Sequence, residues 1–533
     1  MKFSKIQRYI LSVLSGILMV VSFPFSGSLT PLVFISWIPL LLIENEIASK
    51  NYRSRKLLVH SFITFIIYNL GTTWWVSNST LEGSLMAFGL NTIFMVILFQ
   101  LFHSVKKLQG VSVGYLSLVF FWVAFEYLHY QWELSWPWLH LGNYFSIRPE
   151  WVQWYEFTGV YGGTIWVLAL NILGLLILKR RWINKDFGRK SDQLIAIGSA
   201  VFILPFTLSL WMYFSYEETI NPVNVVIVQP NIDPYNEKFD SSTRSQLEKL
   251  TSYASAAIDS TTDFVIAPET ALPEAFYEED VQSVGSVNFL IQQKKEWQLP
   301  NLIIGASTAK YFEKKNSRAS RKMDGGPGYI EYYNTSMLIN SANKTEFIHK
   351  SLLVPGAEII PFSETFPFLE TLALNSGGTS GSLGIEKEPQ VFQTNVGKIA
   401  PLICYESVSG NLLAQQVKKG AEICFVITND GWWGNTPGYK QHASFSRLRA
   451  IETRRYVARS ANTGISGIIN QRGDVISSTP YWEPAVIKGT LQRNSTLTFY
   501  AKHGDYLGRA FALMSIILLL INAYKRIKSL FAA

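Results

Sequence analysis

Cysteine is nearly absent from this sequence, and its scarcity excludes several kinds of site. The 533 residues contain two cysteines, Cys404 and Cys424, with no paired-thiol or metal-ligand spacing nearby, so neither a disulfide framework nor a metal site is indicated. A structural disulfide between the two is permitted by the sequence but not signalled. The seven His residues form no H-E-x-x-H or similar cluster, and we therefore expect no metal and no cofactor.

Charged residues are also scarce. They make up 16% of the chain, against about 25% in a typical soluble protein, and such a deficit is typical of membrane-embedded segments. Residues 1–214 and 506–524 are strongly apolar, whereas 215–505 has ordinary soluble composition. The net charge of +8 does not indicate a nucleic-acid partner, because the Lys and Arg residues are scattered in short loops between apolar runs.

Long apolar runs are abundant. Windows of about 18 or more mostly apolar residues predict membrane helices. The first run follows a basic N-terminus, as in a secretory signal peptide, but it ends in Phe23–Phe25 and not at a small-residue cleavage site, which favours an uncleaved helix. We expect eight spans, at about residues 9–26, 29–46, 57–76, 85–105, 111–131, 162–178, 194–214 and 506–524.

Positive charge is distributed unevenly between the loops on the two sides of these spans. The N-terminus, 47–56, 106–110, 179–193 and the C-terminal tail carry 18 Lys and Arg residues, and the short loops on the other side carry one, Arg148. Positively charged loops stay in the cytoplasm. We therefore expect both termini inside and residues 215–505 outside.

Eight spans exceed what a plain anchor needs, and this favours a bundle that acts on lipid. The outer loop 132–161 is rich in Trp and Tyr, which favour the headgroup zone, so we expect it in or along the outer interface. Glu126 lies near the outer end of the fifth span. At that depth its carboxylate could be functional, or its side chain could extend to the interface by snorkelling. The expected division is a transmembrane domain of seven helices at 1–214, an outward-facing domain at 215–500, and an eighth helix with a cytoplasmic tail at 501–533.

The outer domain alternates short β-type runs with helical stretches. This alternation is typical of an α/β domain in which helices pack on the faces of a sheet. The segment 442–457 has the pattern of an amphipathic helix. The expected strands are Val223–Val228, Phe264–Ala267, Leu302–Ala306, Tyr333–Asn340, Lys398–Cys404 and Ile423–Thr428.

Three stretches of this domain carry side chains that could take part in catalysis. Glu269 follows Pro268 after an apolar strand, Lys350 lies in a loop-like stretch, and Cys404 ends an apolar strand with Glu406 two residues on. Singly, each has an ordinary interpretation: such a Cys is more often buried packing, and a lone Lys or Glu is usually solvated. Together they supply a base and a positive neighbour for a thiol and a donor for an oxyanion. Spacing alone does not establish that they meet.

These stretches resemble the nitrilase (carbon–nitrogen hydrolase) superfamily, whose site is Glu, Lys and Cys in that chain order. With membrane helices on both sides, the whole chain resembles the membrane-embedded N-acyltransferases of that superfamily. The positions that carry the resemblance are Pro268–Glu269, Lys350, Cys404–Glu406, Thr428–Gly434, Phe23–Phe25, Trp136–Gly142, Gln441–His442 and Arg447–Glu452.

The resemblance implies a multi-pass α-helical membrane domain plus an α/β nitrilase-like domain, a four-layer αββα sandwich, in the bacterial inner membrane with the catalytic domain in the periplasm. It also implies a two-step reaction. The thiolate takes an acyl chain from a phospholipid, typically phosphatidylethanolamine, which leaves a lysophospholipid and a thioester on the enzyme. The thioester then acylates the free α-amine of the diacylglyceryl-cysteine at the start of an apolipoprotein. Nothing demands a partner subunit, so a monomer is expected.

Roles for the central residues follow from the same resemblance. Glu269 is implied as the general base, Lys350 as the oxyanion stabiliser and Cys404 as the nucleophile. The backbone N–H of Tyr405 is implied as a second donor to the oxyanion.

The resemblance extends to supporting positions. Glu358 and Glu406 are implied as carboxylates that orient the Lys or hold the pocket, and Trp432 as a residue that lines the substrate path. The family has glycine directly before the first of these carboxylates, whereas this chain has Ala357, which puts the local turn in doubt. Cys424 lies inside an apolar run with no such motif beside it, and we expect it to serve in packing.

Two other interpretations stay open. A membrane-tethered hydrolase of amides or nitriles would use the same three residues with water as acceptor, although a small soluble substrate requires neither eight spans nor an aromatic outer loop. A transporter or lipid-binding protein with a catalytically dead outer domain would have no reason to keep Glu269, Lys350 and Cys404. The Gly- and Ser-rich 375–384 and the basic 313–328 are candidate lids over the site.

Overall fold

The chain forms two compact units. The computed structural model describes residues 2–79, 81–238, 240–323, 325–366, 368 and 381–531. The first unit, which we call the helical unit, comprises Met1–Trp132, Trp136–Ser215 and Asp505–Ala533. The second, which we call the sheet unit, comprises Glu133–Ser135 and Tyr216–Gly504.

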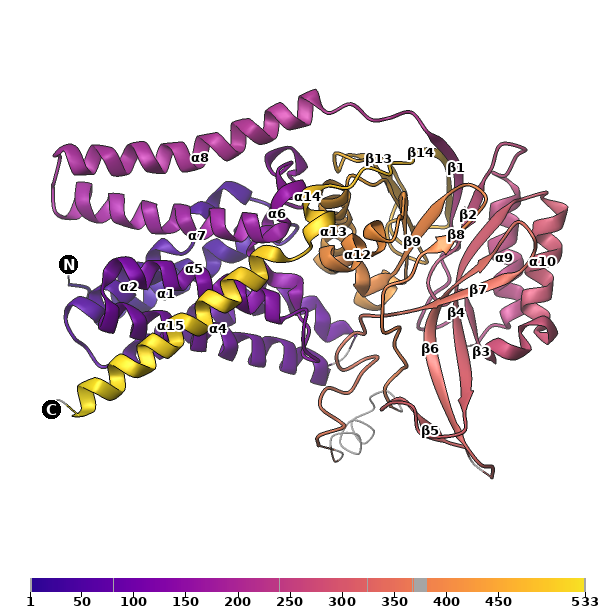
Figure 1. Cartoon of the computed structure of the whole chain (residues 1–533), viewed down its shortest axis with the longest axis horizontal. Helices are drawn as coiled ribbons and strands as arrows, with labels where there is room; N and C mark the ends of the chain where they lie inside the picture. Colours follow the sequence, from indigo (N-terminus) through magenta and orange to yellow (C-terminus); the bar gives the residue numbers. More distant parts are fainter. Residues whose placement is uncertain are drawn as a thin grey trace. The chain divides into compact units, whose positions relative to one another are not determined.

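Long apolar helices make up the helical unit (Figure 1). Within the described residues, eight helical segments are long and apolar enough to cross a membrane. Each overlaps one of the eight predicted spans, so the structure confirms a long apolar helix at each predicted place. The helices are α1 (Lys5–Ser22), α2 (Ile38–Ser49), α3 (Arg55–Thr73), α4 (Leu81–Gln109), α5 (Val111–Leu128), α6 (Tyr155–Thr158), α7 (Val160–Ile177), α8 (Arg189–Ser215) and α15 (Tyr506–Phe531).

Glu126 is buried within the helical unit and is only 2% exposed. One of its carboxylate oxygens accepts a hydrogen bond from the Leu141 N–H at 2.8 Å, and the other accepts one from Thr164 Oγ1 at 2.6 Å. The snorkelling interpretation of Glu126 is therefore wrong, because the carboxylate ties α5 to α7 and to the segment between them.

Aromatic residues of the predicted outer loop also pack inside the helical unit. Trp138, Tyr144 and Trp154 are at most 8% exposed. The rings of Trp138 and Trp75 lie 4.9 Å apart between centroids, and the Tyr144 hydroxyl donates to the Met19 carbonyl at 3.0 Å. These three aromatics contribute to packing, and the interfacial position of the loop as a whole stays a prediction.

Two β-sheets form the centre of the sheet unit. The first has eight strands in the order β14-β1-β2-β4-β6-β5, with β3 paired to β4 and β7 to β6, and the second has six in the order β13-β12-β11-β10-β9-β8. The first-sheet strands are β1 (Pro222–Gln229), β2 (Phe264–Ile266), β3 (Leu272–Tyr277), β4 (Asn301–Phe312), β5 (Arg321–Lys322), β6 (Tyr329–Ile339), β7 (Thr345–His349) and β14 (Ala485–Gln492). Those of the second sheet are β8 (Phe392–Gln393), β9 (Lys398–Ile403), β10 (Ile423–Thr428), β11 (Val457–Ala461), β12 (Gly467–Ile469) and β13 (Val475–Ser478).

The alternation of side chains along the strands explains how the sheets stack. Ile227 of β1 packs in one apolar core with Phe425 of β10, so the two sheets lie face to face. The next residue of β1, Val228, points the other way into a core formed with helix residues such as Leu250. A third core joins the outer face of the second sheet to helices that include Leu413. The unit is therefore a four-layer αββα sandwich, as predicted.

Helices cover the outer faces of both sheets (Figure 1). The first sheet is covered by α9 (Thr243–Ser255) and α10 (Gly285–Glu296). The second is covered by α12 (Gly410–Lys418), α13 (Pro437–Thr453) and α14 (Phe499–His503). Cys424 is fully buried in the core under these last helices. This position agrees with the packing role predicted for it.

The predicted elements match the observed ones with shifts at their ends. The strand predicted at Lys398–Cys404 ends one residue early, because Cys404 adopts a backbone φ of 51° and begins a 3₁₀ turn. The helix predicted at 442–457 is α13, which starts earlier because the Thr436 side chain caps its first turn. It also ends earlier, because Arg454 takes the left-handed conformation that terminates helices.

Phe425 provides a test of the contact between the sheets. It is fully buried, and its ring meets that of Phe264 edge-on at 5.2 Å between centroids. We expect Phe425→Ala to lower the free energy of unfolding by about 3–5 kcal/mol, measured by denaturant unfolding of the purified protein in detergent. Ile476→Ala, at a position 58% exposed on β13, should change it by less than about 0.5 kcal/mol. Equal unfolding midpoints for the two variants would contradict the inter-sheet core.

Candidate active site

Three strands deliver the predicted triad to one place in the sheet unit. Glu269 follows β2, Lys350 directly follows β7, and Cys404 directly follows β9. Side chains at strand ends are held by the sheet and remain accessible. The Lys350 Nζ lies 3.4 Å from Glu269 Oε1, and the charges of both residues act on the Cys404 thiol. The structure thus brings the three together, although they come from two different sheets.

Lys350 is a buried ammonium group. Its side chain is 1% exposed, and its Nζ donates to Glu358 Oε1 at 2.8 Å as well as to Glu269. Burial by itself lowers the pKa of Lys350, but the negative charges of Glu358 and Glu269 outweigh it and hold the pKa well above its usual value. Lys350 therefore stays charged and can stabilise a negatively charged oxygen.

Asn334 of β6 joins the two carboxylates, and no sequence pattern predicted a role for it. Its Nδ2 donates to Glu269 Oε1 at 2.7 Å and to Glu358 Oε1 at 2.9 Å. The Asn429 N–H donates to the other oxygen of Glu269 at 3.0 Å, so both oxygens of that carboxylate are held. In the sequence, Asn334 is only a polar amide within a predicted apolar strand. That pattern does not by itself indicate a catalytic residue.

Cys404 has an unusual backbone conformation for a residue with a side chain. Its φ of 51° lies in the left-handed region, which is uncommon outside glycine and often marks a functional position. The side chain is partly buried against the core between the sheets. Burial and the charge of Glu269 raise the pKa of the Cys404 thiol, while Lys350 acts in the opposite direction. The resting residue is therefore a thiol, which a base must deprotonate before it can attack.

A buried polar cluster supports the turn behind Cys404. His442 Nε2 lies 3.1 Å from the Cys404 carbonyl oxygen and 2.9 Å from Ser407 Oγ, and Nδ1 lies 2.8 Å from Asp430 Oδ1. Burial raises the pKa of Asp430, but Arg459, whose Nη2 donates to it at 2.5 Å, and then His442 hold that pKa below the usual range.

The same cluster has one arrangement that a metal ion could use. Ligand atoms of Cys404, Asp430 and His442 lie within 4.8 Å of one another. Arg459 already supplies positive charge to Asp430 and would repel a cation at that carboxylate. We interpret the cluster as positioning support for Cys404. The stretches containing Asp430 and His442 carried the family resemblance, but the sequence assigned no role to either.

Glu406 links the loop that carries Lys350 to the loop that carries Cys404. Its Oε1 accepts from the Ser351 N–H at 2.6 Å and the Leu352 N–H at 3.3 Å, and its Oε2 accepts from the Ile403 N–H at 2.7 Å. Burial raises the pKa of Glu406 to about 7. The backbone donors favour the charged form and oppose this shift, but burial outweighs them. This placement fits a supporting carboxylate that aligns one loop with the other.

The other predicted residues lie around this centre. Glu358 Oε2 accepts from the Val354 N–H at 2.9 Å, so the turn that contains Ala357 still directs the carboxylate to Lys350. Tyr405 is buried, and its hydroxyl donates to the Ser135 carbonyl at 2.9 Å. The Trp432 carbonyl accepts from the Tyr235 hydroxyl at 2.7 Å.

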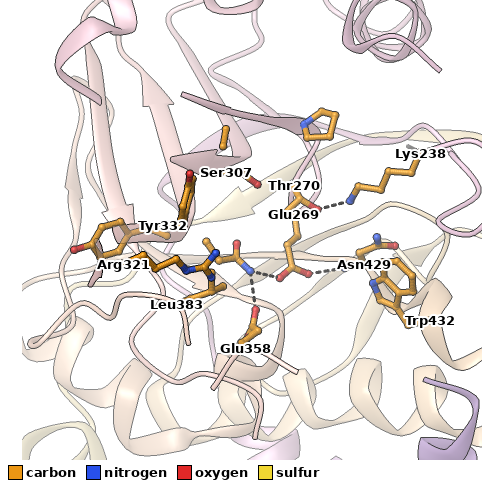
Figure 2. A pocket seen from close by; sticks show the side chains of 14 residues that line it. Lys238, Glu269, Thr270, Ser307, Arg321, Tyr332, Glu358, Leu383, Asn429 and Trp432 are labelled. Carbon is orange, nitrogen blue, oxygen red and sulfur yellow. Dashed lines mark hydrogen bonds between the residues drawn. The ribbon is translucent and has the colours of Figure 1, made fainter. Parts of the chain in front are cut away.

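A pocket of about 560 Å³ opens beside Glu269 (Figure 2), within the roughly 300–1,000 Å³ typical of ligand sites. Trp432 and Glu358 line it, and the role of Trp432 in the substrate path stays a prediction. Each predicted lid contributes a lining residue, Arg321 from 313–328 and Leu383 from 375–384. Residues 324 and 375–380 of these segments lie outside the described residues.

Comparisons with known proteins agree on both parts of the chain. Residues 224–499 match the family model described as carbon–nitrogen hydrolase, and residues 15–173 match the model described as apolipoprotein N-acyltransferase N-terminal domain. An apolipoprotein N-acyltransferase from Chlorobaculum tepidum is 30% identical over 98% of this chain and 97% of its own length. One from Geobacter metallireducens is 27% identical over 94% of this chain and 92% of its own. A crystal structure of a carbon–nitrogen hydrolase from Helicobacter pylori G27 has 14% identity and a TM-score of 0.36, covering 51% of this chain and 89% of that one.

Glu406→Gln tests the link between the two loops. Both oxygens of Glu406 accept backbone N–H groups, so an amide would turn its own N–H₂ against one of these donors and push the loops apart. Displacements of about 1 Å can cost roughly 100-fold in rate, and we expect p-nitrophenyl ester cleavage to slow about 10-fold or more. Glu388→Gln, at a side chain 78% exposed, should keep the wild-type rate. If Glu406→Gln kept both the wild-type rate and the wild-type unfolding midpoint, the proposed role of Glu406 in aligning the two loops would be contradicted.

Proposed function

This chain belongs to the apolipoprotein N-acyltransferase family, and from that membership we propose that it transfers a phospholipid acyl chain, through a thioester on Cys404, to the α-amine of a diacylglyceryl-cysteine. It is a membrane enzyme that N-acylates lipoproteins, and its substrates are a lipid and an apolipoprotein. The observation that carries the catalytic proposal is the Lys350 ammonium held between Glu269 and Glu358, with its charge acting on the Cys404 thiol.

In the first half-reaction Glu269 takes the proton of the Cys404 thiol, and the thiolate attacks the ester carbonyl carbon of the phospholipid. The carbonyl oxygen becomes negatively charged, and the Lys350 ammonium and the Tyr405 N–H stabilise it. The carbon–oxygen bond to glycerol then breaks. The leaving alkoxide takes the proton from Glu269, which releases a lysophospholipid and leaves the acyl chain on the sulfur.

In the second half-reaction the neutral α-amine of the apolipoprotein attacks the thioester carbonyl. Glu269 takes a proton from the attacking nitrogen, and the same donors hold the oxyanion. The carbon–sulfur bond breaks, and the Cys404 thiolate regains its proton from Glu269. The products are an N-acylated lipoprotein and the resting enzyme, so no cofactor or metal is needed for the proton balance.

Glu358, Glu406 and Trp432 act indirectly in this proposal. Glu358 keeps Lys350 charged and aimed at the reaction centre, since its carboxylate lies 2.8 Å from the ammonium. Glu406 aligns the Lys350 and Cys404 loops through three backbone N–H groups. Trp432 gives the pocket an apolar wall.

The alternative of a membrane-tethered amidase uses the same triad with water as acceptor. The carbon–nitrogen hydrolase model alone, matched at 224–499, is compatible with it. The match of residues 15–173 to the acyltransferase N-terminal domain and the eight candidate spans favour acyl transfer between lipid-anchored molecules.

For the arrangement in the cell, we propose a multi-pass protein of the bacterial inner membrane with both termini in the cytoplasm. The transmembrane domain is 1–214, the catalytic domain at 215–500 lies in the periplasm, and 501–533 contains the last span and tail, with its first four residues in the sheet unit. The distribution of Lys and Arg among the loops supports this orientation. The sequence demands no partner subunit, and we propose a monomer.

Replacement of the nucleophile tests the reaction directly. After incubation with phospholipid alone, the wild-type protein should gain the mass of one acyl chain on the peptide that contains Cys404. Cys404→Ala should gain none and should lose transfer to a diacylglyceryl-cysteine peptide by roughly 1,000-fold or more. Cys424→Ala is the matched control, because that thiol is buried in a core away from the pocket, and it should still form the adduct. Transfer by Cys404→Ala at the wild-type rate would rule out the thioester.

Orientation has its own test with single cysteines in a Cys404→Ala, Cys424→Ala background. Lys387→Cys lies at an exposed position of the sheet unit, and Arg53→Cys lies at an exposed position between α2 and α3. A thiol reagent that cannot cross membranes should label the first in intact spheroplasts and the second only after lysis. The reverse pattern would place the catalytic domain in the cytoplasm.

A further inference from the structure

Lys238 is a buried lysine in the wall of the active-site pocket that the proposed mechanism does not use. It is 7% exposed, and its Nζ donates a hydrogen bond to Thr270 Oγ1 beside Glu269 (Figure 2). Its backbone is fixed as well: the Lys238 N–H donates to the Asp233 carbonyl at 2.9 Å, and its carbonyl accepts from Gln246 Nε2 at 2.7 Å. The ammonium group is therefore held in place at the pocket.

A second cation, Arg321, lines the same pocket from another direction. In Figure 2 it lies on the opposite side of Glu269 from Lys238. Its guanidinium lies over the ring of Tyr332, 5.1 Å from the centroid, and β5, which carries Arg321, pairs with β6. A guanidinium packed on an aromatic ring is partly ordered before a ligand arrives.

Four charged side chains line the pocket. Lys238 and Arg321 are positive, and Glu269 and Glu358 are negative, so their formal charges balance. Both carboxylates are ion-paired with Lys350, which is not one of the lining side chains, whereas Lys238 donates to a neutral hydroxyl. A buried ammonium group that donates to a neutral acceptor favours an anionic ligand beside it.

We propose that Lys238, with Arg321 across the pocket, binds the phosphate group of the acyl donor, a glycerophospholipid phosphodiester. The inference rests on the proposed function, because the phospholipid is there the first substrate. The phosphodiester carries one negative charge, whereas the diacylglyceryl-cysteine acceptor has no phosphate. Lys238 thus selects the first substrate and contributes little to recognition of the second.

The titration of Lys238 supports this assignment. Burial lowers the pKa of Lys238 to about 8, although the charge of Glu269 opposes the shift. A phosphate beside the ammonium restores a favourable environment for the positive charge. Only the protonated form attracts the anion, so the apparent affinity for phospholipid should fall as the pH rises through about 8.

Acylation of Cys404 by two donors separates a phosphate contact from other roles of Lys238. The donors are dipalmitoyl phosphatidylethanolamine and p-nitrophenyl palmitate, which has the same acyl chain and no phosphate, both in detergent micelles with the full-length protein. For Lys238→Met, the ratio of the acylation rate constant with phospholipid to that with the p-nitrophenyl ester should fall about 10-fold or more below the wild-type ratio. Lys238→Arg should recover most of it. Lys249→Met, at a half-exposed lysine paired with Glu237, should leave the ratio unchanged.

Inorganic phosphate identifies the source of the anion. Slowing of wild-type acylation but not of Lys238→Met acylation by phosphate shows that the site accepts the free ion as well as the lipid headgroup. If phosphate slows neither protein but the phospholipid-to-ester rate ratio still falls in Lys238→Met, the contact of Lys238 is with the phosphate of the lipid and not with the free ion.

Two outcomes would overturn the proposal. An equal loss with both donors, which leaves the ratio at the wild-type value, would make Lys238 a positioning residue for the Glu269–Thr270 segment. A loss confined to the later transfer to the amine would make it part of acceptor binding. Failure of the wild-type protein to acylate Cys404 with either ester would count against the proposed function itself and is thereby distinguished from both.

Discussion

The ammonium group of Lys350 lies almost completely out of water, and the rest of the site is arranged around that charge. Removing one partner from a buried ion pair typically costs about 3–5 kcal/mol, so Glu358 and Glu269 are tied to Lys350 as firmly as it is tied to them. Asn334 donates to both carboxylates, which eases the repulsion between them. The Lys350 N–H donates to the Asn334 carbonyl at 2.8 Å, so the register of β6 and β7 places the amide and the ammonium together.

Cys404 comes from the other sheet, and its distance from this charge cluster depends on how the two sheets stack. The apolar core between the sheets sets that spacing, and Glu406 adds three hydrogen bonds between the Lys350 loop and the end of β9. His442 contacts the carbonyl of Cys404 and, together with Asp430, supports the turn at that residue. The thiol is protonated at rest because burial disfavours its anion. Its reactivity is therefore set by a base and an oxyanion donor that are fixed in place before any substrate arrives.

The sequence predicted those features that depend on local pattern alone. Apolar length identified the eight spans, and a reactive residue after a strand, together with the family resemblance, identified Glu269, Lys350 and Cys404. Asn334 was missed because the pairing of β6 with β7, which no local pattern reports, decides whether an amide in a strand meets the site. Lys238 was missed because its partner Thr270 is distant in the sequence. The burial of Glu126 likewise depends on Leu141 and Thr164, which belong to other segments.

The central claim is that acyl transfer passes through a covalent intermediate on Cys404, and the most direct measurement is the stoichiometry of lysophospholipid release without an acceptor. Enzyme mixed with excess phospholipid should release one lysophospholipid for each Cys404 in a rapid burst and then stop. Addition of a diacylglyceryl-cysteine peptide should restart release at the rate of N-acylation. Continuous release without the peptide would identify a hydrolase. No release until the peptide is present would identify direct transfer, and either result would contradict a thioester on Cys404.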